Sequence, residues 1–116
     1  MPQITDLTWQ QLETAIGVNN AIIVDPTHGI CIRVGAFLGS NPTAKTAMGV
    51  VETLFELREA AKKAQDTANT NQLIGERLAA FPPASSGTAV NGFVMQTGSI
   101  TVRTPLATNG IVGAAN

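Results

Sequence analysis

The chain has 116 residues and a formal net charge of −1, and charged side chains make up only 13% of it. It carries no cluster of Lys and Arg, so a main role in binding nucleic acid, which needs several phosphate contacts, is disfavoured. The length fits one domain, and so few charges predict that part of the surface is buried in an oligomer.

The cysteine content and the hydropathy pattern bear on the compartment. The single cysteine, Cys31, cannot form a disulfide within the chain, which favours a reducing compartment. No apolar run of 18 residues occurs, and the segment MPQITDLTWQQ has neither a basic start nor an apolar core. We therefore expect no membrane span and no signal peptide, and a cytoplasmic protein.

The first predicted element is a short helix over residues 8–16. Thr8 and Gln11 have the spacing of a capping box, and Gly17 is placed to end the helix. Three apolar side chains recur at helical spacing and are predicted to form its buried face: Trp9, Leu12 and Ile16.

The segment NAIIVDPTHGICIRVGA predicts a β-hairpin. Asp25 suits the first position of a turn, Pro26 presets φ for the second, and Gly29 can be left-handed at its end. We expect a four-residue loop, with the pairs Asp25–Ile30, Val24–Cys31 and Ile23–Ile32. This register predicts one apolar face that consists of Ala21, Ile23, Ile30, Ile32 and Val34.

The strongest helix signal is GSNPTAKTAMGVVETLFELREAAKKAQDTA, with Asn41 as a cap and Pro42 at the first helical position. Between Ala47 and Leu57 apolar residues cover most of the helix circumference, which predicts neighbours on more than one side. The remaining polar face is formed by Lys45, Glu52, Glu56, Glu59, Lys63 and Asp66.

After the long helix, NQLIGERLAAF resumes a helical pattern that Pro82 and Pro83 must stop. Residues 67–89 are therefore a candidate helical insertion. Whether the two helical parts form one helix that continues to Phe81 is left open by the pattern.

The carboxyl-terminal third predicts three strands. Gly98-Ser99 is a two-residue signal for a type II′ turn, and it would pair Thr97 with Ile100, Met95 with Val102 and Phe93 with Thr104. Asn109-Gly110 predicts a second turn before a short final strand. The expected fold is thus a single α+β domain, 1–116, with a central antiparallel five-stranded sheet and the order α-β-β-α-(α)-β-β-β.

Three side chains of the first hairpin resemble parts of a catalytic site. Asp25, His28 and Cys31 are spaced three residues apart, but each also has a structural role in the predicted turn, so a catalytic dyad is the weaker interpretation. Zinc needs three or four ligands, and one His and one Cys supply two.

Two further chemistries have weak signals. Glu52 and Glu56 lie one helical turn apart, where a solvated face is the commoner explanation than paired catalytic carboxylates. GAFLGSNPTAKT precedes the long helix but lacks the GxxxxGK[ST] pattern of a phosphate loop. We expect no catalytic residue, no metal and no cofactor.

The order of elements resembles the Roadblock (dynein-light-chain-like) domain family of the profilin-like folds. The resemblance rests on GVNNAIIVDPTHGICIRVG, AMGVVETLFELREAAKKA and GFVMQTGSITVRTPLATNGIVGAA, about two-thirds of the chain. These are patterns of residue class, and the stretch from Thr67 to Ala89 is longer than in that family.

The resemblance implies a non-enzymatic dimeric scaffold or regulatory module, which would act with another protein such as a small Ras-like GTPase. By position, it implies a dimer interface of Met48, Val51, Leu54, Phe55, Phe93, Val94, Met95 and Gln96. It implies a partner face of Glu52, Glu56, Glu59 and Lys63. Two alternatives stay open: an enzyme or redox sensor that uses Cys31 and His28, and a profilin-like module that binds a small molecule.

Overall fold

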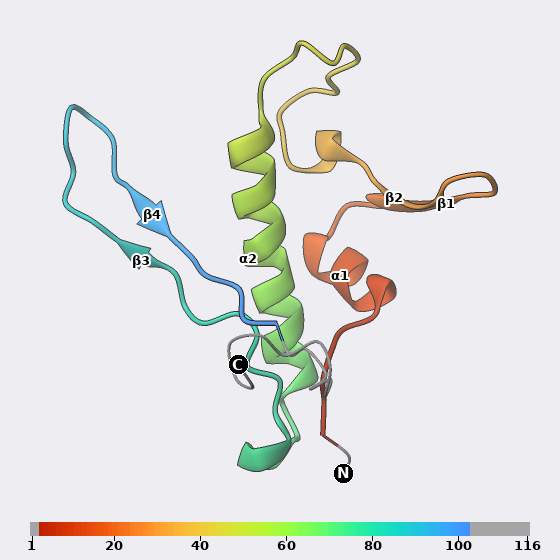
Figure 1. The fold of residues 1–116 in the computed structure, drawn as a ribbon, viewed down its shortest axis with the longest axis vertical. Helices are drawn as coiled ribbons and strands as arrows, with labels where there is room; N and C mark the ends of the chain where they lie inside the picture. Colours follow the sequence, from red (N-terminus) through yellow and green to blue (C-terminus); the bar gives the residue numbers. More distant parts are fainter. Residues whose placement is uncertain (1–2, 103–116) are drawn as a thin grey trace, which may run out of the picture.

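The structure is a computed structural model that describes residues 3–102 (Figure 1). Its first helix, α1, spans Trp9–Ile16. The Thr8 hydroxyl accepts a hydrogen bond from the Gln11 backbone N–H at 3.1 Å, and the Gln11 side chain accepts one from the Thr8 N–H at 2.7 Å. Gly17 ends the helix with φ 79°. The predicted capping box and the glycine stop are both confirmed.

The buried face of α1 is narrower than the sequence predicts. Leu12 is buried and α1 packs against α2, but Trp9 is 52% exposed. Because α1 has only two turns and packs mainly against α2, much of its surface stays exposed, and the expectation that Trp9 belongs to the core is wrong.

The first hairpin consists of β1 (Ile22–Asp25) and β2 (Gly29–Ile32), and its predicted register is wrong by one residue. The observed pairs are Ile22–Ile32, Ile23–Cys31, Val24–Ile30 and Asp25–Gly29. The loop therefore has three residues, and Gly29, at φ 81°, closes it in the left-handed conformation typical of such loops. The one-residue shift brings Val24 and Ile30 to one face and Ile23 and Cys31 to the other.

The long helix, α2, spans Val50–Ala68 and begins eight residues later than predicted. Gly49, with φ 129°, precedes it in a conformation that a helix cannot continue. Asn41 does not cap the helix, because its side chain packs on Gly35 at a point where a Cβ atom would clash. A 3₁₀ turn, η1 (Val34–Ala36), and further turns fill the interval.

The predicted helix over residues 71–81 is also wrong. This segment contains one 3₁₀ turn, η2 (Ile74–Glu76), and then runs extended beside α2. Two of the apolar residues expected on the buried face of that helix, Leu73 and Ile74, are instead 68% and 83% exposed. The long helix is therefore not continuous to Phe81.

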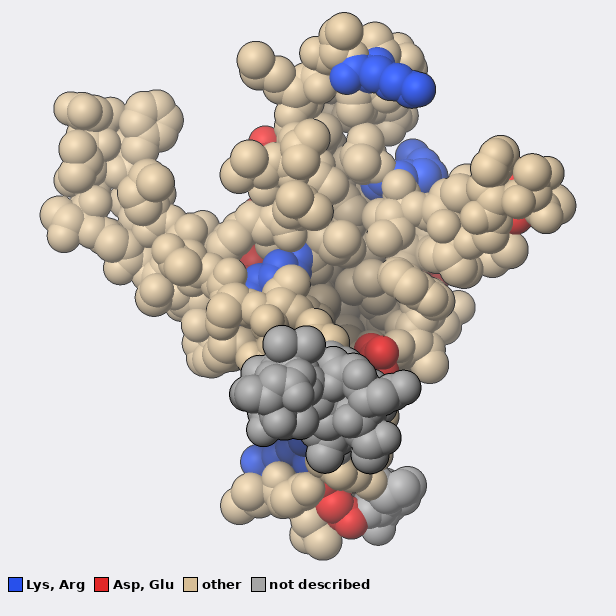
Figure 2. Space-filling model, in the orientation of Figure 1, with Lys and Arg blue, Asp and Glu red and all other residues tan. Residues whose placement is uncertain are grey.

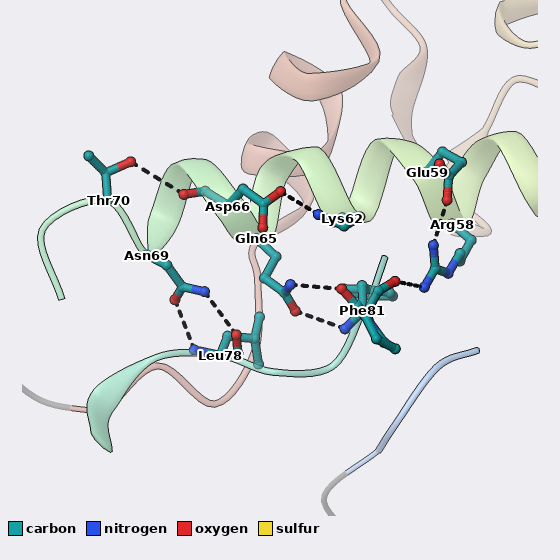
Figure 3. A network of polar contacts seen from close by, with 10 residues as sticks. Arg58, Glu59, Lys62, Gln65, Asp66, Asn69, Thr70, Leu78 and Phe81 are labelled. Carbon is teal, nitrogen blue, oxygen red and sulfur yellow. Dashed lines mark hydrogen bonds and ion pairs between the residues drawn. The ribbon is translucent and has the colours of Figure 1, made fainter. Parts of the chain in front are cut away.

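Side chains of α2 and its end, rather than a helix of its own, hold the extended segment (Figure 3). The Asn69 amide exchanges two hydrogen bonds with the Leu78 backbone, both at 2.8 Å. Arg58, which is 4% exposed, donates to the Pro82 carbonyl and, at 3.0 Å, to the Ser99 carbonyl. These side chains form hydrogen bonds with backbone groups of the segment that a neighbouring strand would otherwise pair.

The second hairpin consists of β3 (Ser85–Ser86) and β4 (Gln96–Thr97), paired as Ser85–Thr97 and Ser86–Gln96. Asn91 and Gly92 form its tip, with φ 54° and 81°, between the bridged residues Val90 and Phe93. We call residues 85–97 the arm. Asn-Gly at a two-residue turn is the strongest local hairpin signal, and the turn forms at Asn91-Gly92 instead of at Gly98-Ser99.

The predicted Gly98-Ser99 turn is therefore wrong. Residues 98–101 return towards α2, where the Thr101 N–H donates to the Ala80 carbonyl at 2.8 Å. The predicted partner Thr104, the turn at Asn109-Gly110 and the final strand lie outside the described residues.

The fold class is α+β, but the expected central five-stranded sheet is contradicted. The described residues form two separate two-stranded antiparallel sheets, which extend on opposite sides of α2 (Figure 1). Since β4 pairs back on β3 instead of forward, no strand within residues 3–102 connects the two hairpins.

The core is small for a chain of this length. The buried apolar residues of the described chain are Leu12, Ala21, Ala61, Ala64 and Leu78, three of them alanines. The chain exposes 8798 Å², nearly half as much again as the about 6,000 Å² expected for a compact monomer of 12.0 kDa. Its radius of gyration is 17.3 Å, where about 13 Å is typical of this length.

Candidate functional site

The three side chains that suggested catalysis lie in and beside the first turn, and the turn explains their contacts. One oxygen of Asp25 accepts hydrogen bonds from the Thr27 N–H at 2.9 Å, the His28 N–H at 2.7 Å and the His28 ring Nδ1 at 2.8 Å. Cys31 lies in β2, where its thiol donates to the Gly29 carbonyl at 3.6 Å. The imidazole is therefore directed at the carboxylate, and the thiol at the backbone.

The hydrogen bonds around Asp25 have an electrostatic effect. Those from the His28 backbone, the His28 side chain and the Thr27 backbone stabilise the carboxylate and hold the pKa of Asp25 below its usual range. The ionised Asp25 carboxylate therefore stabilises the turn. Within the part of the chain that the structure describes, no group of three or more His, Cys, Asp or Glu side chains could hold a metal ion.

The four residues of the expected partner face divide between two settings. Glu52 is exposed in the first turn of α2. Glu56, Glu59 and Lys63 line a shallow hollow between α2, α1 and η1, and Glu59 also accepts from Arg58 at 2.5 Å. They do not form one continuous charged surface.

Two residues of the expected helical interface line a groove: Met48, which precedes α2, and Leu54. Met48, Val51 and Leu54 are 93%, 82% and 61% exposed, while Phe55 is half-buried. The groove has a volume of about 500 Å³ and runs beside the amino-terminal end of α2. Its lining is largely apolar and consists of Val34, Leu38, Pro42, Thr43, Ala44, Lys45, Ala47, Met48, Gly49, Val50, Thr53 and Leu54.

The strand part of the expected interface lies on the arm. Phe93, Val94 and Met95 are 74%, 51% and 70% exposed, and Gln96 is exposed in β4. The sequence from Leu78 to Val102 contains no charged residue. The arm, on the left of Figure 2, accordingly shows neither basic nor acidic side chains.

The structure thus places the expected interface residues on two surfaces that are apart. Helix pairing and strand pairing across one continuous sheet, as in the Roadblock arrangement, would have brought them together. Sequence reasoning missed Val90 of the arm and Leu38 of the groove. Asn91-Gly92 was the available signal for the first, whereas the second depends on turns between η1 and α2 that have no distinctive pattern.

No helix of the described residues has the length and apolar character needed to cross a membrane. No protein-family model, curated protein or solved structure matches the chain.

Proposed function

We propose that the chain is a non-enzymatic structural module that associates with copies of itself and serves as a scaffold. The observation that carries this proposal is the exposed area of 8798 Å² around so small a core. The surplus over a compact monomer is about 2,800 Å² per copy, or about 5,600 Å² for a pair, which is at the upper end of the roughly 2,000–5,000 Å² or more that obligate interfaces bury over both partners.

The two hairpins give the same indication. A two-stranded hairpin alone in water is marginally stable, and edge strands without charged side chains invite pairing with other chains. The arm has no charged residue, and Val24 of the first hairpin is 74% exposed. Both hairpins need a cover that the described chain does not supply. A small-GTPase partner is implied only by the Roadblock layout and finds no support in this geometry.

The test is the molar mass in solution, measured by light scattering and sedimentation velocity at micromolar concentration. We expect a dimer or a larger closed assembly with a fixed number of copies. A species that stays at 12.0 kDa as the concentration rises would contradict the proposal.

Small-molecule binding is the second candidate function, and one observation favours it. Thr53 is 8% exposed and borders the groove, and its hydroxyl has no hydrogen-bond partner among the described residues. Native mass spectrometry of the purified protein tests this candidate: a retained small molecule, lost in a Leu54→Asp variant, would support it. A spectrum with the bare chain alone would count against it.

A further inference from the structure

We propose that the arm of one copy inserts into the apolar groove of a second copy, and that the arm of the second copy inserts into the groove of the first. This inference rests on the self-association proposed above and specifies the two surfaces that meet. The arm supplies Phe93, Val94 and Met95, and the groove supplies Leu38, Met48 and Leu54.

The arm has the properties of an inserted element. It projects from α2 on the side away from the first hairpin, so its apolar side chains face solvent (Figure 1). It is fastened at its base, where Arg58 binds the carbonyls of Pro82 and Ser99, the residues that flank the arm on either side. A fixed base and an uncovered tip direct Phe93 outwards at 74% exposure.

The groove has the properties of a receiving site. Its volume of about 500 Å³ lies within the range of sites that enclose ligands, and it is open to solvent. Lys45 is the one charged side chain in its lining. An aromatic side chain such as Phe93 that enters it would bury roughly 150–250 Å² of its own surface.

The occupant is a second copy because area and stoichiometry agree. Each copy has one arm and one groove, so a two-fold exchange fills both and leaves neither open. Two arm–groove contacts in one dimer would cover part of the surplus of about 2,800 Å² that each copy exposes. The uncharged arm has no electrostatic means of selecting an acidic or basic partner.

Two substitutions on exposed positions test the exchange without touching the core. Phe93→Asp spoils the arm and Leu54→Asp spoils the groove, at side chains 74% and 61% exposed. Ile74→Asp, at 83% exposure in η2, is the matched control outside the arm, the groove and both hairpins. Circular dichroism of each variant checks that α2 is retained.

Each test variant should weaken association on the order of tenfold or more, whereas the control should associate like the unchanged chain. The decisive sample is a mixture of the two test variants. The Leu54→Asp copy has an intact arm and the Phe93→Asp copy has an intact groove, so their heterodimer keeps one sound contact. Mixing should therefore restore a dimer, weaker than that of the unchanged chain.

The outcomes separate the two proposals. If the unchanged chain is monomeric, the proposed self-association fails. If the unchanged chain is a dimer but the mixture gives no heterodimer, self-association stands and the exchange is overturned. In a dimer held by helix-to-helix or arm-to-arm pairing, every mixed dimer would carry a substituted residue in its one interface, so mixing would restore no intact contact. A disulfide between Phe93→Cys and Leu54→Cys in a Cys31→Ser background must link two chains; a bond within one chain would also overturn the exchange.

Discussion

The side-chain amide of Gln65 forms a closed pair of hydrogen bonds with the backbone of Phe81. Its Nε2 donates to the Phe81 carbonyl at 2.9 Å, and its Oε1 accepts from the Phe81 N–H at 2.8 Å (Figure 3). A primary amide offers the same donor and acceptor as a peptide group. Gln65 therefore takes the place of a missing strand for a segment 16 positions further along the chain.

Replacing Gln65 with Met should destabilise the protein by about 1–3 kcal/mol, because both backbone groups of Phe81 then lose their partner beside a side chain that is 6% exposed. Urea unfolding measures the change. Gln10→Met, at an exposed position of α1, is the control and should leave the midpoint unchanged. Equal midpoints for the two variants would show that the Phe81 contacts do not matter.

Replacing Arg58 with Lys should release the base of the arm. A lysine ammonium cannot reproduce the planar fork that reaches both Pro82 and Ser99, so hydrogen exchange of the nearby Thr101 N–H should accelerate. Arg33→Lys is the control, since the Arg33 guanidinium also donates to two backbone carbonyls, those of Asn19 and Asn20, but beside the first hairpin. Unchanged exchange at Thr101 in the Arg58 variant would remove the assigned role.

Replacing Gly29 with Ala should cost about 1–2 kcal/mol, because φ 81° is a left-handed conformation in which a Cβ atom is strained. Gly39→Ala makes the same chemical change at a glycine that has no left-handed φ and open space around it. Thermal unfolding of the two variants separates backbone strain from the general effect of removing a glycine. A smaller loss at Gly29 than at Gly39 would be the contrary result.

The first turn should weaken in acid. Because the pKa of Asp25 is lowered in the folded chain, its stabilising effect is present above the usual pKa of 3.8 and is lost as pH falls through the folded value. Amide resonances of Thr27 and His28 should therefore shift only in strongly acidic solution. Asp25→Asn should abolish that transition, while Asp6→Asn, outside the turn, should leave it in place.

The proposed assembly should depend little on salt. Both the arm and the groove are almost uncharged, so screening has few ion pairs to weaken. Association constants at low and high sodium chloride, measured by sedimentation, should agree within a few-fold. A steep loss of association with salt would indicate a charged interface elsewhere on the chain.

The sequence predicts the elements that depend on near neighbours. Thr8, Gln11 and Gly17 fix α1 within nine positions, and Asp25 with Gly29 fixes the first turn, so both elements were found. The predicted register of that hairpin was wrong because the same sequence is compatible with a four-residue loop and with a three-residue loop closed by a left-handed glycine.

The failures are those in which distant contacts override the local pattern. Residues 71–81 have helical spacing, yet Gln65 and Asn69 satisfy their backbone in an extended form. Gly49 and the packing of Asn41 on Gly35 delay α2, which the apolar periodicity alone does not indicate. The interface residues were chosen by family resemblance, and the structure leaves most of them exposed on two surfaces instead of one.

The position of Arg58 along the chain has a consequence for the order of folding. Its acceptors Pro82 and Ser99 lie 24 and 41 positions later, whereas α1, the first hairpin and the groove use residues up to Leu54. Contacts between distant positions form late because closing a long loop costs entropy. A chain emerging from the ribosome therefore has its groove residues before the residues that fasten its own arm. In the proposed exchange, the arm of a finished neighbour would reach that groove first.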